Sequence, residues 1–371
     1  MIKTKKIYYI EPVVIPGKAA HSIQIQENIK ELNKISKLTL ISYYFDKKIG
    51  ICKHIAFKKS RFFNKIVPWR IFHFLFLIRK IKFDKNSYLI TRNPILAIFL
   101  NKKFNNIAME IHSIPNIKNN LIQYTLFYLF LFNIPLFFLK RKNIKFIVIN
   151  NILKKDLIKK GFNANKIKVL PDAVDLKKFD INLSKKEARK KLKFPINKKI
   201  ILYTGTFQDW KGYDILLEAS NNFDEKVVFV MIGGKKKQIT RLRRIYKKVI
   251  LKEFMNNKII PYYLKAADIL IIPNSAKKII SLKYTSPLKL FEYMASKRPI
   301  IASDLPSIRE IVSEKEVLFF EPDNPEDLAE KIRILLKDIK LQEDISKNAF
   351  EKVKNFTWEK RARNIINKIL N

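Results

Sequence analysis

One stretch of the chain combines residue types that could bind both a phosphate and a sugar. Ser286 is a natural helix N-cap, because its hydroxyl can accept from first-turn amides, and Pro287 suits the first helical position. Such a helix start presents amides and the positive end of the helix dipole to an anion. Lys289 adds a cation to this turn, and Glu292 adds a carboxylate suited to sugar hydroxyls. An ordinary capped helix is the alternative interpretation.

Two further segments place glycine or lysine directly after an apolar run. Gly205 ends the run at 200–204, where the missing side chain lets a ligand approach the backbone. Lys211 follows six residues later and could reach a phosphate. Gly233 and Gly234 end another apolar run, and they permit a tight turn with free amides. A solvated lysine and a plain strand-to-helix turn are the alternatives.

The first half of the chain offers a smaller set of candidates. Gly17 and Lys18 lie in a loop that opens a predicted helix, where small residues would let a substrate approach. Arg92 and His112 each follow an apolar run, so each is expected at the end of a strand. A plain loop, a surface arginine and a structural histidine are the alternatives for these positions.

The stretch from Tyr284 to Asp304 resembles the donor-binding signature of GT-B glycosyltransferases, specifically glycosyltransferase family 4. In that family a Glu-x7-Glu motif ends on a helix, and its second glutamate aligns with Glu292, whereas Tyr284 occupies the position of the first. The resemblance implies that Glu292 binds the ribose of a nucleotide sugar. It also implies that the helix start holds the diphosphate, which makes Ser286, Pro287 and Leu288 donor-binding candidates.

The resemblance extends to the other candidate residues. The pattern from Gly205 through Lys211 is similar to a family motif whose lysine neutralises the donor diphosphate, although Thr206 stands where the family often has arginine. Further roles are implied for residues near the nucleotide, the sugar and the reacting carbon. The implied set is Gly17, Gly205, Lys211, Gly233 and Gly234 for donor binding, and His112, Lys211 and Glu292 for catalysis. Lys18, Arg92 and Tyr284 are candidates for acceptor or sugar contacts.

The pattern of apolar runs predicts the elements that must position these residues. Short apolar segments alternate with helix-like ones in both halves, which indicates parallel sheets covered on both faces. We expect an α/β protein with two Rossmann-like domains that face a central cleft, as in GT-B enzymes. The predicted parts are an acceptor-side domain (1–180), a lysine-rich linker (181–198), a nucleotide-sugar-binding domain (199–355) and a C-terminal helix crossing back to the first domain (356–371).

The amino-acid composition limits the binding partners and the cellular compartment that can be expected for the chain. The 371 residues include 75 Lys and Arg against 33 Asp and Glu, a net charge of +42, so the chain should attract polyanions. The basic residues are spread along the whole chain, and no nucleic-acid-binding module is recognised, so no specific nucleic-acid partner is predicted. The single cysteine excludes a disulfide framework and fits the cytoplasm.

Three segments bear on membrane contact. The N-terminal apolar run is broken by Glu11 and Pro12, so it predicts a strand and not a signal peptide. Residues 121–139 carry no charge, but Asn133 and Pro135 interrupt them, which favours a buried or interfacial helix over a membrane span. Residues 61–82 mix aromatic and basic side chains, and this mixture suits either an anionic membrane surface or a solvated helix. We expect peripheral attachment to the inner face of the cytoplasmic membrane.

The resemblance, together with these patterns, implies a retaining, metal-independent glycosyltransferase without a cofactor. It would move a sugar from a nucleotide-sugar donor to a glycan or lipid-linked acceptor in cell-envelope synthesis. No metal-ligand constellation is recognised among the scattered histidines and carboxylates. A sugar-nucleotide epimerase of the same fold, or a basic nucleic-acid-binding protein, are the alternatives.

Overall fold

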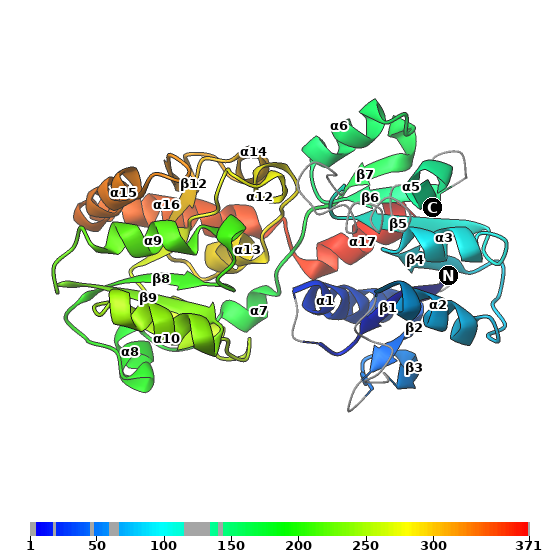
Figure 1. Cartoon of the computed structure of the whole chain (residues 1–371), viewed down its shortest axis with the longest axis horizontal. Coiled ribbons are helices and arrows are strands. Elements are labelled where there is room, and N and C mark those ends of the chain that lie inside the picture. The colour runs from blue at the N-terminus through cyan, green and yellow to red at the C-terminus, as the bar shows by residue number, and fades with distance from the viewer. Residues whose placement is uncertain are drawn as a thin grey trace. The chain divides into compact units, whose positions relative to one another are not determined.

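The computed structural model describes residues 5–17, 20–44, 48–58, 67–114, 134–139 and 144–369. The chain divides into two compact units (Figure 1). The first comprises Met1–Pro171 together with Trp358–Asn371, and the second comprises Asp172–Thr357. Each unit contains one parallel sheet, so the α/β prediction is confirmed.

The first unit is an alternation of strands and helices. Its strands are β1 (Lys6–Val14), β2 (Lys37–Tyr44), β3 (Lys53–Lys58), β4 (Tyr88–Thr91), β5 (Asn106–Ile111), β6 (Ile144–Val148) and β7 (Ile167–Val169). Its helices are α1 (Ala20–Ile35), α2 (Val67–Ile78), α3 (Pro94–Leu100), α5 (Ile134–Leu139), α6 (Asn151–Lys159), the 3-10 turn η3 (Ala164–Lys166) and α17 (Trp358–Lys368).

The first sheet has the order β3-β2-β1-β4-β5-β6-β7. The inner strands are mostly buried, and Ile7 and Ile90 from the neighbouring strands β1 and β4 are fully shielded from solvent, whereas the outermost strand β3 has no buried residue. Helices α1 and α17 share one core cluster with β1, contributing Ile29 and Ile365 among others. In Figure 1 the red helix α17 accordingly lies with the blue elements of this unit, although it ends the chain.

The second unit continues the same alternation. Its strands are β8 (Lys199–Thr204), β9 (Val227–Gly234), β10 (Ile250–Glu253), β11 (Ile269–Ile272), β12 (Ile300–Ser303) and β13 (Leu318–Phe320). Its helices are α7 (Leu176–Phe179), α8 (Lys185–Leu192), the 3-10 turn η4 (Asp209–Lys211), α9 (Tyr213–Ser220), α10 (Lys236–Ile245), α11 (Ile260–Ala266), α12 (Ile279–Lys283), α13 (Leu288–Ala295), α14 (Pro306–Arg309), α15 (Pro325–Lys337) and α16 (Ile339–Val353).

The second sheet has the order β10-β9-β8-β11-β12-β13, and all of its pairings are parallel. Side chains of α9, α10 and α15 cover one face, where Tyr203 and Ile271 are buried. Side chains of α8, α11, α13 and α16 cover the other, where Leu202 and Ile272 are buried. Because both faces are covered, the inner strands such as β11 and β12 are buried along their whole length.

The boundary between the units differs from the predicted one. The lysine-rich segment 181–198, predicted as a linker, lies within the second unit and contains helix α8. Ser184 and Glu187 form a capping box at the start of this helix, and Ala188 and Phe194 are buried in the core. A lysine-rich composition does not distinguish a linker from an amphipathic helix whose lysines lie on its exposed side.

Some predictions for the first unit fall outside the described residues. Of the uncharged segment 121–139, only the last six residues are described, as α5. Lys18 and residues 61–66 are also outside the described part. None of the helices in the described ranges has the length and apolar character that crossing a membrane requires.

Candidate active site

The strand order of each sheet identifies one edge as the favoured place for a ligand. In the second sheet, β8 lies between β9 and β11, so the connections leaving β8 and β11 turn to opposite sides. Open α/β sheets bind ligands outside the carboxyl ends of the strands at such a reversal. The segments after β8 and β11 are in contact there, since the amide of Ser275 donates to the carbonyl of Trp210 at 3.1 Å.

Gly212 allows this contact. Its φ of 60° lies in the left-handed region, and a β-carbon at this position would be 1.7 Å from the carbonyl oxygen of Pro273. Any other residue would therefore push the two segments apart. This glycine follows Lys211 directly, so the close approach also positions the lysine.

Lys211 ends the short η4 turn, and its amine is held beside the end of β8. Its Nζ donates to Oγ1 of Thr206 at 2.7 Å. Burial lowers the pKa of Lys211 to about 8, because the charged amine loses hydration. Thr206, which stands where the resembled family often has arginine, thus orients the lysine.

Lys289 lies in the first turn of α13, and its amine is shielded from solvent without a hydrogen-bond partner among the described residues. The Nζ of Lys289 is 4.6 Å from the centroid of the Tyr203 ring. Burial, and then the positive charge of Lys211, hold the pKa of Lys289 well below its usual range. The carboxyl edge of the second sheet therefore brings two amines together.

The start of α13 differs in detail from the sequence prediction. The helix begins at Leu288, with Pro287 as the N-cap residue, and no side chain caps it. Ser286 was predicted as the cap, but its Oγ accepts instead from the backbone amide of Asp172 at 3.1 Å. Tyr284 ends the preceding helix α12, and its amide donates to the carbonyl of Ile280 at 3.0 Å.

A tyrosine fixes α13 to the end of β8. The amide of Thr204 donates to the Oη of Tyr293 at 2.8 Å, and both residues are buried. Glu292 precedes this tyrosine and is three residues beyond Lys289, so the two side chains lie on neighbouring positions of the helix surface. The predicted set of Lys211, Glu292 and the start of α13 is thus assembled at one edge of one sheet.

The predicted glycines shape the backbone at this edge. Gly233 has a φ of 123°, and a β-carbon there would be 2.3 Å from the carbonyl oxygen of Gly205. Gly205 in turn donates its amide to the carbonyl of Ile232 at 2.8 Å. The glycines bring the ends of β8 and β9 together, and Gly234 lies directly against Phe207. Ligand contact by these glycines remains a prediction.

In the first unit, a buried glutamate organises the residues predicted to act on the sugar. Oε1 of Glu110 is 3.0 Å from Nε2 of His112 and accepts from Arg361 at 2.5 Å, while its Oε2 accepts from Nε of Arg92 at 3.2 Å. Burial alone would raise the pKa of Glu110, but Arg361 and Arg92 hold it well below its usual range. Arg92 is therefore not a surface arginine, since its side chain is only 13% exposed.

A second buried glutamate lies beside this cluster. Glu11, on β1, accepts hydrogen bonds from the backbone amide of Arg92 and from Oγ1 of Thr91. Burial raises the pKa of Glu11 to about 7. Two glutamates at the carboxyl side of one sheet thus differ in protonation.

The loop after β1 is described up to Gly17. Ser22 donates its hydroxyl to the carbonyl of Val14 at 2.6 Å, and a β-carbon on Gly17 would lie 2.5 Å from that hydroxyl oxygen. Gly17 therefore serves the packing of α1 against the loop, and its predicted donor contact remains a prediction.

Sequence reasoning did not select four residues of these clusters as site residues. Glu11 and Glu110 are carboxylates inside apolar strands, and such an interruption is a usable signal. Arg361 lies on the apolar side of α17 with Trp358, which is a second signal. Lys289 adds a cation to the helix start in the sequence, but the sequence does not reveal that its amine is buried.

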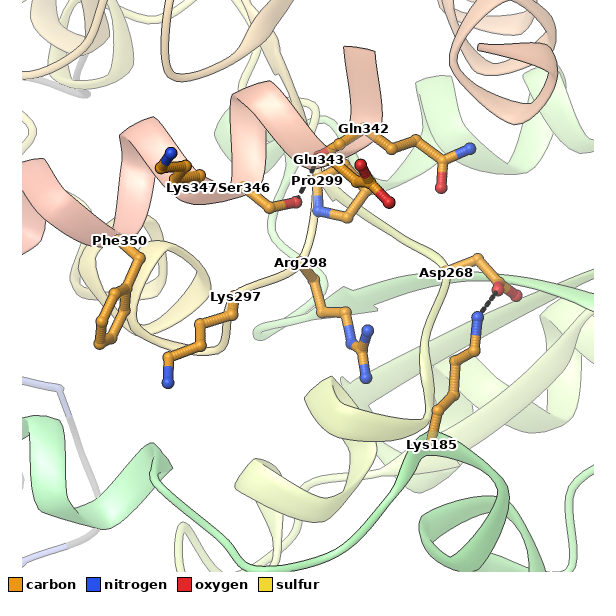
Figure 2. A pocket seen from close by; sticks show the side chains of 10 residues that line it. All are labelled: Lys185, Asp268, Lys297, Arg298, Pro299, Gln342, Glu343, Ser346, Lys347 and Phe350. Carbon is orange, nitrogen blue, oxygen red and sulfur yellow. Dashed lines mark hydrogen bonds and ion pairs between the residues drawn. The ribbon is translucent and has the colours of Figure 1, made fainter. Parts of the chain in front are cut away.

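A cavity of about 480 Å³ lies at the opposite edge of the second sheet (Figure 2). Asp268 and Pro299, which directly precede β11 and β12, line it together with residues of α16. Within the cavity, Lys185 donates to Asp268 at 2.7 Å, as the dashed line in Figure 2 marks. Parallel strands place their amino and carboxyl ends on opposite edges, so this cavity is separate from the predicted donor site.

Comparison with known proteins finds similarity to glycosyltransferases. Residues 184–352 match the family model for glycosyl transferases group 1. The glycosyltransferase TuaC of Bacillus subtilis, described as a putative teichuronic acid biosynthesis protein, is 27% identical over 46% of this chain and 41% of its own length. N,N'-diacetylbacillosaminyl-diphospho-undecaprenol alpha-1,3-N-acetylgalactosaminyltransferase of Campylobacter jejuni is 28% identical over 55% of this chain and 54% of its own. The chain thus spans about half the length of these relatives.

Solved structures match nearly the whole chain at low identity. Sucrose-phosphate synthase from Thermosynechococcus elongatus has a TM-score of 0.75 at 18% identity and covers 97% of both chains. HepE from Anabaena in complex with UDP-glucose also has a TM-score of 0.75, at 14% identity, covering 97% of this chain and 98% of its own. Residues 184–352 are therefore similar to the glycosyl transferases group 1, and the fold of the chain is that of the GT-B glycosyltransferases.

Proposed function

We propose that this protein is a retaining, metal-independent glycosyltransferase that moves a sugar from a nucleotide-sugar donor to an acceptor hydroxyl. In this reaction the bond between the anomeric carbon and the diphosphate breaks, and a bond to the acceptor oxygen forms. Negative charge therefore builds on the departing diphosphate, and preorganised cations lower the barrier most effectively. The observation that carries the proposal is the convergence of Lys211 with the uncapped start of α13 at the carboxyl edge of the second sheet.

The other residues take roles that follow from their chemistry. Glu292 offers a carboxylate beside the same helix start and is proposed to bind the ribose hydroxyls. In the first unit, Nε2 of His112 donates to the carboxylate of Glu110 at 3.0 Å, and this orients the ring so that Nδ1 is proposed to accept a hydrogen bond from a hydroxyl of the transferred sugar. Tyr284, Lys18 and Arg92 remain candidates for acceptor or sugar contacts.

The names of relatives and structural neighbours support a nucleotide-sugar donor and a glycan or lipid-linked acceptor. A solved neighbour of the same fold is in complex with UDP-glucose, and the Campylobacter relative is named for a lipid-linked diphospho-undecaprenol acceptor. We therefore propose a nucleotide-sugar donor and a glycan or lipid-linked acceptor at a cytoplasmic membrane surface. The basic character of the chain suits such an anionic surface.

A donor screen followed by a release assay tests the proposal. Thermal-shift measurements with UDP, GDP, ADP and CDP sugars would select a donor, and transfer would be followed by release of the nucleoside diphosphate. An epimerase would convert the donor without this release. We expect Lys211→Met to lower transfer by about 100-fold or more, because it removes a cation at the leaving group. Glu292→Ala should weaken donor binding by about tenfold or more.

Lys340→Met is the matched control, because Lys340 is exposed on α16 and outside the proposed site. It should transfer at the wild-type rate. Full activity of Lys211→Met or of Glu292→Ala would remove the corresponding residue from the proposed site, and stabilisation by none of the sugar nucleotides would contradict the function.

A further inference from the structure

The amine of Lys289 is an unexplained feature of the second unit. It is shielded from solvent, and among the described residues it has no hydrogen-bond partner. Most buried polar groups in proteins are paired, so an isolated buried amine calls for a physical reason. The lysine lies in the first turn of α13, at the edge of the sheet where the reversed strand order favours a ligand.

The surroundings of this amine oppose a positive charge. Burial strips water from the charged amine, and Lys211 on η4 contributes a second positive charge; together they outweigh the attraction of the Tyr203 ring at the end of β8. Two carboxylates are nearby: after burial and Tyr293, Asp214 raises the pKa of Tyr203, and after burial Glu292 raises that of Tyr293. Burial and the charge of Lys211 therefore favour the neutral amine of Lys289 in the empty site.

An anion would reverse this balance. The start of α13 has no side-chain cap and presents the positive end of the helix dipole. A diphosphate bound there would meet the helix start and the amines of Lys211 and Lys289 together. Its negative charge would offset both the burial of the second amine and the repulsion between the two lysines.

We propose that Lys289 is a second cation of the donor site, neutral when the site is empty, and that it takes up a proton from solvent as the donor's diphosphate binds. The inference rests on the proposed function, because it assigns a diphosphate to this edge of the sheet. It adds a coupling between donor binding and proton uptake. It also predicts selectivity for a diphosphate over a monophosphate, since a single phosphate supplies less charge to protonate the amine.

Calorimetry in buffers of different ionisation enthalpy measures this proton uptake directly. Nucleoside diphosphate and monophosphate of the selected base would be titrated at pH 7. At this pH Lys211 is already about nine-tenths protonated, since its pKa is about 8, so Lys211 adds at most about a tenth of a proton to the uptake. We expect uptake of a large fraction of one proton with the diphosphate and much less with the monophosphate.

Lys289→Met should abolish most of this uptake and weaken diphosphate binding at least tenfold, with little change for the monophosphate. Lys340→Met, at the corresponding second position of the exposed helix α16, should behave as wild type. Diphosphate binding by the wild type without proton uptake would overturn the inference and leave the proposed function standing, and this holds even if the variant does not fold. Wild-type affinity and uptake in a folded Lys289→Met variant would overturn it too. Failure of the wild type to bind any nucleotide would instead refute the proposed function.

Discussion

Single residues at the carboxyl edges show how partners decide the charge of a buried group. Glu11 and Glu110 are 3% and 1% exposed, respectively. The pKa of Glu110 is well below its usual range because Arg361 and Arg92 outweigh its burial, whereas burial raises the pKa of Glu11 to about 7. Similar burial therefore produces a permanent anion at one position and a group that titrates near neutrality at the other.

The titration of Glu11 predicts a pH dependence of stability. Its folded pKa of about 7 exceeds its ordinary value of 4.5, so the folded state holds the proton more tightly than the unfolded one. The contribution of this proton to the free energy of unfolding is complete below pH 4.5, falls as the pH rises towards 7, and amounts to about 3 kcal/mol at most. Glu11→Gln should flatten this decline, because glutamine does not titrate and can still accept from Arg92 and Thr91. Urea unfolding between pH 5 and 8 measures the difference.

Glu359→Gln is the matched control, since Glu359 lies in the same unit but is exposed on α17. It should keep the wild-type slope. A wild-type slope in Glu11→Gln would show that Glu11 is charged throughout this range.

At the scale of elements, α8 is held to the second sheet by a buried ion pair. Arg189 is 4% exposed, and it donates to the carboxylate of Asp268 at 2.5 Å and to the carbonyls of Ala266 and Ile196 at 2.9 and 2.8 Å. Asp268 also accepts from the amide of Ile200 at the start of β8. One arginine thus joins the helix to the starts of two strands.

Replacing this arginine should detach the helix from the sheet. We expect Arg189→Met to lower the free energy of unfolding of the second unit by about 3 kcal/mol, because it removes the buried guanidinium from the carboxylate of Asp268 and from the carbonyls of Ala266, Ile196 and Lys198. Denaturant titration followed by Trp210 fluorescence measures the loss. Lys190→Met, at an exposed neighbouring position, should change stability by about 0.5 kcal/mol at most. Equal stability of the two variants would mean that the ion pair does not hold α8.

These elements also show which features the sequence could predict. The inner strands were predictable because buried parallel strands are short apolar runs, and their order then brings Lys211 and α13 to one edge. The outermost strands β3, β7, β10 and β13 were not predicted. The lack of a side-chain cap on α13 was not predictable, because the hydroxyl of Ser286 accepts instead from the amide of Asp172, 114 residues away. The partnership of Glu110 with Arg361 spans 251 residues and depends on where α17 packs. Local patterns therefore predicted the positions of elements but not the pairing of distant polar groups.

At the scale of the whole molecule, the net charge of +42 attracts anionic surfaces generally, so charge alone cannot identify a membrane-binding surface. In the first unit, aromatic and basic side chains form a defined surface on α2 and after α3. Phe76 is 51% exposed, with the guanidinium of Arg79 at 4.4 Å from its ring. Lys103 donates to the carbonyl of Arg79 at 3.4 Å and lies 5.9 Å from the ring of Phe99. Such a surface can combine insertion of aromatic rings with attraction to anionic lipid.

A substitution that keeps the charge separates these two contributions. We expect the wild type to float with vesicles containing anionic lipid at low salt, and Phe76→Ser to bind them about tenfold more weakly, because a buried phenylalanine ring contributes about 1.5–3 kcal/mol. Phe254→Ser is the matched control, since Phe254 is 48% exposed in the second unit. Equal flotation of the two variants would assign vesicle binding to the dispersed charge, and no flotation of the wild type at low salt would refute the membrane-surface proposal. Because both variants carry the wild-type net charge, any difference between them must come from the ring itself.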